Sequence, residues 1–205
     1  MIKVKERASI TDLFMTTAKQ LAAEQAGYIR NSIQSSPRYA DRIRKENSQK
    51  ILNIQAVLDE DRFRTSLRCL PYTSFAVVDD CLVGRTDPIT ITDGRRKQFS
   101  AGEYLVFVKK EWLLCGAARV HLIPVLEPRT EWRTPHHVVS SSNTGNPWTW
   151  RENTCLGSFA SMLSALYNEF NLVEIFRTWH LYLSRYDEHS PLCRIERISH
   201  IKEIE

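Results

Sequence analysis

The first sixty residues carry apolar side chains at the spacing of amphipathic helices. One face repeats at i, i+3, i+4 and i+7, and it carries Ile10, Leu13, Phe14, Thr17, Leu21, Tyr28, Ile29 and Ile33. Ser9 and Asp12 ahead of it resemble a capping box. A polar break at 31–36 ends this helix, and Pro37 suits the first turn of a second. The second helix is expected to bury Ile43, Ile51, Ile54 and Leu58. The pattern is consistent with an αα-hairpin packed on the rest of the chain, or with one helix belonging to the domain that follows.

From about residue 67 the hydrophobic period shortens to that of strands. β-branched and aromatic residues alternate with polar ones, and Asp93-Gly94 is a turn signal. The strands are expected at Thr73–Val78, Cys81–Gly84, Ile89–Thr92, Tyr104–Val108 and Ala118–Val125, with a short connection at 109–116. Their close spacing predicts an antiparallel meander.

A long stretch from about Leu126 to Thr154 shows neither period and holds three prolines and three tryptophans. Such a loop inside a compact domain is usually functional. Two helical patterns follow, with shared faces of Leu156, Phe159, Ala160, Leu163, Leu166 and Tyr167, and of Leu172, Ile175, Phe176, Trp179, Leu183 and Tyr186. Because strands and helices are segregated, the sequence predicts an α+β protein with a helical region at 1–62 and a domain at 63–205.

Composition narrows the class of protein. Hydrophobic residues make up 42% and charged residues 25%, as in soluble folded proteins. No apolar run reaches the roughly 20 residues of a membrane span, and no signal peptide is recognised, so a cytoplasmic location without membrane contact is expected. The net charge is +4, with basic residues gathered at 38–50 and 95–97. No aromatic residues interleave with them for base stacking, so nucleic acid is not expected as a partner.

The chain has five cysteines, at 69, 81, 115, 155 and 193, and no Cys-x-x-Cys pair. This pattern disfavours a disulfide framework or a zinc ribbon and favours reduced thiols. Cys155 stands where the irregular stretch is expected to give way to a helix. A helix N-terminus favours the thiolate, which is the nucleophilic form of cysteine. Cys155 is therefore the candidate nucleophile, although a cysteine buried beneath the helix is the simpler alternative.

The order of motifs resembles a known family. Strands ending in Arg119–Val125 precede Thr134-Pro135-His136-His137-Val138, which is followed by Cys155-Leu156-Gly157 and, farther on, by Tyr182–Asp187. The series resembles the ubiquitin-conjugating enzymes, and in particular their bacterial relatives with a His-Pro-His and Cys-Leu-Gly pattern. The resemblance covers roughly residues 67–198. It implies a UBC-like fold, namely a four-stranded antiparallel meander flanked by helices, here with an N-terminal helical extension.

The resemblance also implies an activity. Such a transferase accepts a ubiquitin-like protein from an activating enzyme as a thioester, here on Cys155, and passes it to a protein substrate. His136, His137 or Asn143 would support the oxyanion formed in each transfer, and no metal or cofactor is expected. The partners implied are an activating-enzyme-like protein and a ubiquitin-like modifier. Bacterial relatives often occur in operons with them, commonly for antiviral defence against phages.

The chain departs from the family pattern at several positions. Thr134 stands where the motif histidine is usual, His136 stands at the motif asparagine, and the segment between His137 and Cys155 is longer than in eukaryotic members. A non-catalytic scaffold of the same fold is one alternative, and a cysteine hydrolase using a histidine at 136, 137 or 180 is a second. A zinc site of His136, His137 and Cys155 is disfavoured, because adjacent histidines rarely both reach one metal.

Overall fold

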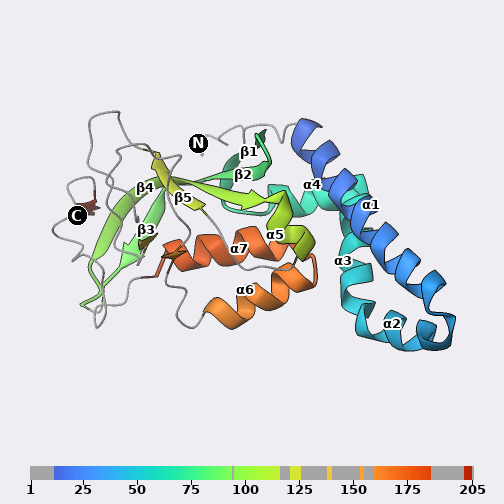
Figure 1. Ribbon diagram of the computed structural model, residues 1–205. Helices are drawn as coiled ribbons and strands as arrows, with labels where there is room; N and C mark the ends of the chain where they lie inside the picture. The colour runs from blue at the N-terminus through green and yellow to red at the C-terminus, as the bar shows by residue number, and fades with distance from the viewer. Residues whose placement is uncertain are drawn as a thin grey trace.

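The protein is an α+β structure, as the sequence predicts. The computed structural model describes residues 12–93, 95–115, 121–125, 138–139, 153–154, 159–185 and 201–204. Helices occupy the N-terminal third, an antiparallel sheet the middle, and two further helices follow (Figure 1). Among the described helices, none combines the length and the apolar character that a membrane span requires.

The helical region contains more helices than the two expected. Its elements are α1 (Asp12–Ser35), a 3-10 turn (Pro37–Tyr39), α2 (Ala40–Glu46), α3 (Ser48–Leu58) and α4 (Glu60–Arg68). The predicted second helix is broken because polar side chains cap it internally. The Asn47 side chain donates to the carbonyl of Ile43, and the Asp59 carboxylate accepts from the backbone N–H of Arg62 at the start of α4.

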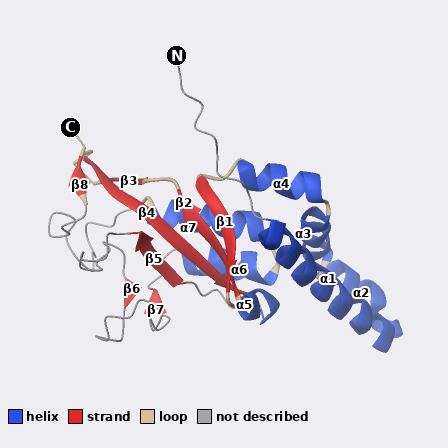
Figure 2. Ribbon diagram, turned by 90° about the horizontal axis from the view of Figure 1, so that it is seen from above, coloured by secondary structure: helices blue, strands red, loops and turns tan. Residues whose placement is uncertain are grey.

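The helical region extends away from one end of the sheet, with α2 farthest from it (Figures 1 and 2). The buried residues of α1 end at Gln25, so its last ten residues bury none, and α2 buries none fully. The predicted buried face of the second helix is therefore wrong in part. Ile54 is buried, but Ile43 and Ile51 are half-buried and Leu58 is 40% exposed, because the helices there pack chiefly on one another.

The sheet is an antiparallel meander around one long strand. Its strands are β1 (Tyr72–Val78), β2 (Cys81–Thr86), β3 (Ile89–Thr92), β4 (Gln98–Lys109), β5 (His121–Val125) and β8 (Lys202–Glu203). β2 and β3 pair with successive halves of β4 in nearly the same register, so they act as one interrupted strand. β5 and β8 also pair with β4, and β1 pairs with β2.

The links between strands agree only partly with the prediction. The expected turn at Asp93 is confirmed, since its carboxylate accepts the backbone N–H groups of Arg95 and Lys97. The connection after β4 is short, as expected, but it forms a helix that the sequence did not predict, α5 (Lys110–Cys115). Trp112 and Leu113 of this helix are buried in the main core, which accounts for a helix at this position.

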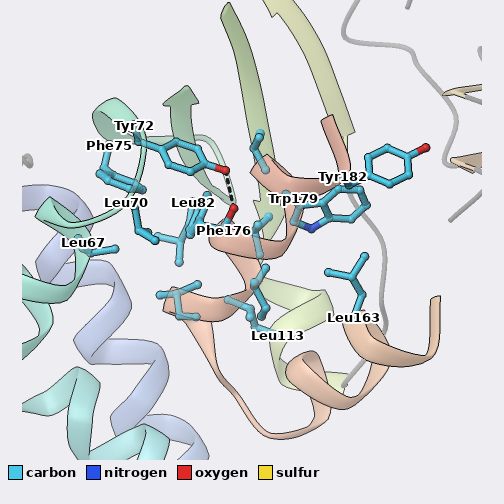
Figure 3. Close-up of a cluster of buried hydrophobic side chains, with 14 of the residues drawn as sticks. Leu67, Leu70, Tyr72, Phe75, Leu82, Leu113, Leu163, Phe176, Trp179 and Tyr182 are labelled. Atoms are coloured by element: carbon cyan, nitrogen blue, oxygen red, sulfur yellow. Dashed lines mark hydrogen bonds between the residues drawn. The ribbon is translucent and has the colours of Figure 1, made fainter. Parts of the chain in front are cut away.

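Helix α7 (Leu172–Leu183) lies against the sheet, and α6 (Phe159–Asn168) packs on α7 and α5 (Figure 1). Leu163, Phe176 and Trp179 are fully buried in the main core (Figure 3). The hydroxyl of Tyr72 on β1 donates to the Phe176 carbonyl on α7 at 2.7 Å, which ties strand to helix. Because one hydrophobic cluster runs from Phe14 of α1 to α7, the helical region shares its core with the sheet.

The boundary expected between residues 62 and 63 falls inside α4. Phe63 and Leu67 of this helix are buried in the same cluster as α1 and the sheet. The division of the chain into a region at 1–62 and a domain at 63–205 stays a prediction. A domain boundary placed at either end of α4, and not inside it, would keep the helix and its buried residues in one piece.

Adding one methyl group at Gly84 and at Gly27 should change the stability of the fold in opposite directions. A Cβ at Gly84 would lie 2.7 Å from the Tyr72 ring, which its hydrogen bond to Phe176 holds in place. Gly84→Ala should therefore destabilise the fold by about 1–3 kcal/mol. A Cβ at Gly27 meets nothing within 4 Å, so Gly27→Ala in α1 should stabilise it by about 0.5–1 kcal/mol. Urea unfolding midpoints measure both changes, and an unchanged or raised midpoint for Gly84→Ala would contradict this packing.

Candidate functional site

The candidate catalytic residues Cys155, His136, His137 and Asn143 lie outside the described residues. What the structure does describe is a pair of short strands inside the stretch expected to be irregular. β6 (Val138–Val139) pairs antiparallel with β7 (Asn153–Thr154). The register joins Val138 to Thr154 and Val139 to Asn153. Two distant parts of the stretch from 126 to 154 are therefore joined by backbone pairing.

This strand pair lies next to the candidate residues in the sequence. His137 precedes Val138 directly, and Cys155 follows Thr154 directly. Val138 and Thr154 are the cross-strand partners. The paired residues are thus the chain neighbours of His137, the candidate histidine, and of Cys155, the candidate nucleophile. In the sequence seventeen residues lie between His137 and Cys155.

The first helix after Cys155 begins at Phe159 in the described part of the chain. Phe159 is 7% exposed, and its ring makes an edge contact with that of Tyr182, with centroids 5.5 Å apart. The Arg185 guanidinium lies over the same Phe159 ring, 5.4 Å from its centroid. The start of α6 is thereby fixed to the end of α7. That Cys155 stands at a helix N-terminus stays a prediction.

Three other cysteines are described, and they differ in burial. Cys81 is buried on β2, and burial, together with the neighbouring Asp80 carboxylate, raises the pKa of its thiol to about 12. Cys69 and Cys115 are exposed, and each stands at the C-terminal end of a helix, α4 and α5.

His180, the histidine considered for a hydrolase, lies on α7 against the sheet. Its ring centroid is 6.2 Å from that of Tyr72, and the side chain is half-buried. Burial lowers the pKa of His180, and the Asp87 carboxylate opposes this by raising it. The neutral imidazole is therefore favoured. His121 lies on β5, paired with Phe107 of β4.

Two concave surfaces occur on the described part of the molecule. One is an apolar groove of about 500 Å³ between α1 and α3, called the helical groove below. Its lining residues are Ala26, Ile29, Arg30, Ile33, Gln34, Arg44, Ile51, Ile54, Gln55 and Leu58. A second hollow lies beside α5 and is lined by Gln25, Tyr28, Glu111, Leu114 and Cys115. Among the residues described, no group of three or more His, Cys, Asp or Glu side chains is placed to hold a metal ion.

Sequence reasoning missed the helical groove because it assigned these isoleucines and Leu58 to a closed interface. The charge pattern is the sequence signal for it, since basic residues concentrate in the same segment. An apolar helix face that is flanked by unpaired cations is more typical of a binding surface than of a core.

The order of elements, the β6–β7 pairing and the described surfaces are the features from which a function can be inferred. Comparison of the chain with protein-family models, with curated proteins and with solved structures gave no match.

Proposed function

We propose that this chain is a ubiquitin-conjugating-like carrier that accepts a ubiquitin-like protein from an activating enzyme as a thioester on Cys155 and transfers it to a protein target. The observation that carries the proposal is the β6–β7 pairing. His137 and Cys155 are each one residue, about 3.8 Å along the chain, from a member of the Val138–Thr154 pair. This supports a role for the histidine segment and the thiol at one site.

The order of elements supports a UBC-like fold. An antiparallel meander is followed by the strand pair, the candidate cysteine and two helices, of which the second packs on the sheet and the first packs on the second. This is the order of the family the sequence resembles. The helices α2 and α3 and the inserted α5 would then be additions that belong to this chain.

The chemistry requires a thiolate and an oxyanion donor. The Cys155 sulfur attacks the carbonyl carbon of the modifier's thioester on the activating enzyme, and a tetrahedral oxyanion forms. The oxyanion collapses, the carbon–sulfur bond to the activating enzyme breaks, and that sulfur leaves as a thiolate. His136, His137 or Asn143 would donate a hydrogen bond to the oxyanion. The second transfer repeats these steps with an amine or a thiol of the target as the attacking group.

The test is a charging reaction. The chain is mixed with ATP and with the activating-enzyme-like and ubiquitin-like proteins encoded beside its gene, and the products are separated on a non-reducing gel. The expected result is an adduct with the summed mass of chain and modifier that dithiothreitol removes. Mass spectrometry of the adduct's peptides identifies the modified cysteine.

Two results would change the interpretation. If the activating enzyme carries its own thioester but passes nothing to this chain, the carrier proposal is wrong and a scaffold of the same fold is the better account. If the modifier is released as a free acid from a preformed amide or ester, a cysteine hydrolase is favoured instead.

A further inference from the structure

The helical groove has the dimensions of a site for a short helix. Along α1 its lining runs from Ala26 to Gln34, a rise of about 12 Å, and along α3 it runs from Ile51 to Leu58. A guest helix that presents side chains at i, i+4 and i+7 covers about 10 Å. The groove is therefore long enough for three such anchors.

The apolar lining of the groove is only partly covered. Ile29, Ile33 and Ile51 are half-buried and Leu58 is 40% exposed, while Ile54 at the floor is 3% exposed. Aliphatic side chains that line a concave surface and remain in contact with water favour an apolar guest.

The surroundings of the groove are strongly basic. Residues 26–58 contain six basic and two acidic side chains, a net charge of +4 that equals the net charge of the whole chain. Both acidic residues are already paired, Asp41 with Arg44 at 2.9 Å and Glu46 with Arg42 at 3.4 Å. The charged residues that line the groove itself, Arg30 and Arg44, are both cations.

Four cations of this segment are uncompensated. Within the part of the chain that the structure describes, Arg30, Arg38, Lys45 and Lys50 have no carboxylate partner. Lys50 is half-buried beside Ile51, and burial lowers the pKa of its ammonium group. A guest with carboxylates would neutralise charges that the chain itself leaves unpaired.

We propose that the helical groove binds an acidic amphipathic helix of a partner protein, with its apolar side chains between α1 and α3 and its carboxylates against Arg30 and the other uncompensated cations of this segment. The groove lining has no aromatic ring on which nucleic-acid bases stack. Its concave shape suits inserted side chains rather than a flat lipid surface. The proposal uses no residue of the thioester chemistry and stands or falls separately from it.

The experiment is a selection from a displayed library of helical peptides. Apolar residues are fixed at i, i+4 and i+7, all other positions are random, and the target is the full chain. Leu58→Asp, which places a charge in the groove, serves for counter-selection. Enriched peptides are expected to be acidic, and synthetic copies should bind at least about tenfold more weakly to Leu58→Asp and to Arg30→Glu by fluorescence anisotropy.

Two matched variants control for general effects. Leu52→Asp adds the same charge on α3 at a residue that is 57% exposed and outside the groove. Arg95→Glu reverses a charge at the exposed turn between β3 and β4. Both should bind the selected peptides within about twofold of wild type, and Cys155→Ala should bind them equally well.

Three outcomes would overturn the proposal. Enriched peptides that are neutral or basic would reject the acidic partner. No enrichment of any peptide on the wild-type chain over Leu58→Asp would reject a helix-binding groove. Self-association in sedimentation velocity that Leu58→Asp abolishes and Leu52→Asp preserves would assign the groove to a second copy of this chain.

Discussion

Cys155→Ala is expected to lower the yield of the dithiothreitol-sensitive adduct by at least about a hundredfold, because it removes the sulfur that forms the thioester. Cys155→Ser should instead give an adduct that resists dithiothreitol, since an oxygen ester does not exchange readily with thiols. The measurement is densitometry of non-reducing gels under one set of charging conditions. Both variants should unfold at the wild-type urea concentration.

Three of the other cysteines provide the matched controls. Cys69→Ala and Cys115→Ala change exposed thiols and should form the adduct at the wild-type rate. Burial raises the pKa of the Cys81 thiol to about 12, so this thiol stays protonated near pH 8. An adduct that survives in Cys155→Ala but disappears in Cys69→Ala or Cys115→Ala would move the thioester to that residue and contradict the proposed site.

Most of the fold could be predicted because its elements are long and strongly periodic. The buried positions of α7 follow one helical face, and β3 alternates buried and exposed residues as expected. The α+β class follows from the same patterns. Because such a pattern depends on many residues at once, one polar residue within it does not hide the element.

Where prediction failed, a few local or distant contacts decided the structure. The capping interactions of Asn47 and Asp59 divide one apparent helix into three. The helix α5 forms because Trp112 and Leu113 reach a core made by residues far away in the sequence. Spacing along the chain does not contain that information.

The candidate site was less predictable than the fold. β6 and β7 are two residues long each, too short for a periodic signal, and their register depends on pairing across a long loop. The helical groove was missed for a different reason. Ile51 and Leu58 satisfy a helical pattern equally well whether the face they share packs on a neighbour or remains open to a partner.

The structure also predicts how the helical region and the sheet unfold. Phe176 on α7 contacts Phe14 of α1 and Phe75 of β1, with ring centroids 6.0 and 5.3 Å apart. All three rings are at most 2% exposed. Helix α1, strand β1 and helix α7 therefore share one aromatic cluster, of which Figure 3 shows Phe75 and Phe176. Because α1 and the sheet stabilise each other there, they should unfold together.

Phe176→Ala is expected to lower the free energy of unfolding by about 3–5 kcal/mol, through lost burial and the cavity left behind. This is a large fraction of the roughly 5–15 kcal/mol typical of a folded domain. The hydrogen bond from Tyr72 would persist, since its acceptor is the backbone carbonyl of Phe176. Urea unfolding followed by tryptophan fluorescence and by far-UV circular dichroism measures the change.

Two variants separate the loss of the ring from general effects. Phe176→Leu keeps most of the apolar volume and should cost about half as much or less. Met162→Ala truncates a side chain that is 45% exposed on α6 and should change stability by no more than about 0.5 kcal/mol. Since the cluster joins α1 to the sheet, both probes should report one coincident transition in the wild type. A helical signal that melts separately from the tryptophan signal, or a cost below about 1 kcal/mol for Phe176→Ala, would mean that the aromatic cluster does not couple the helical region to the sheet.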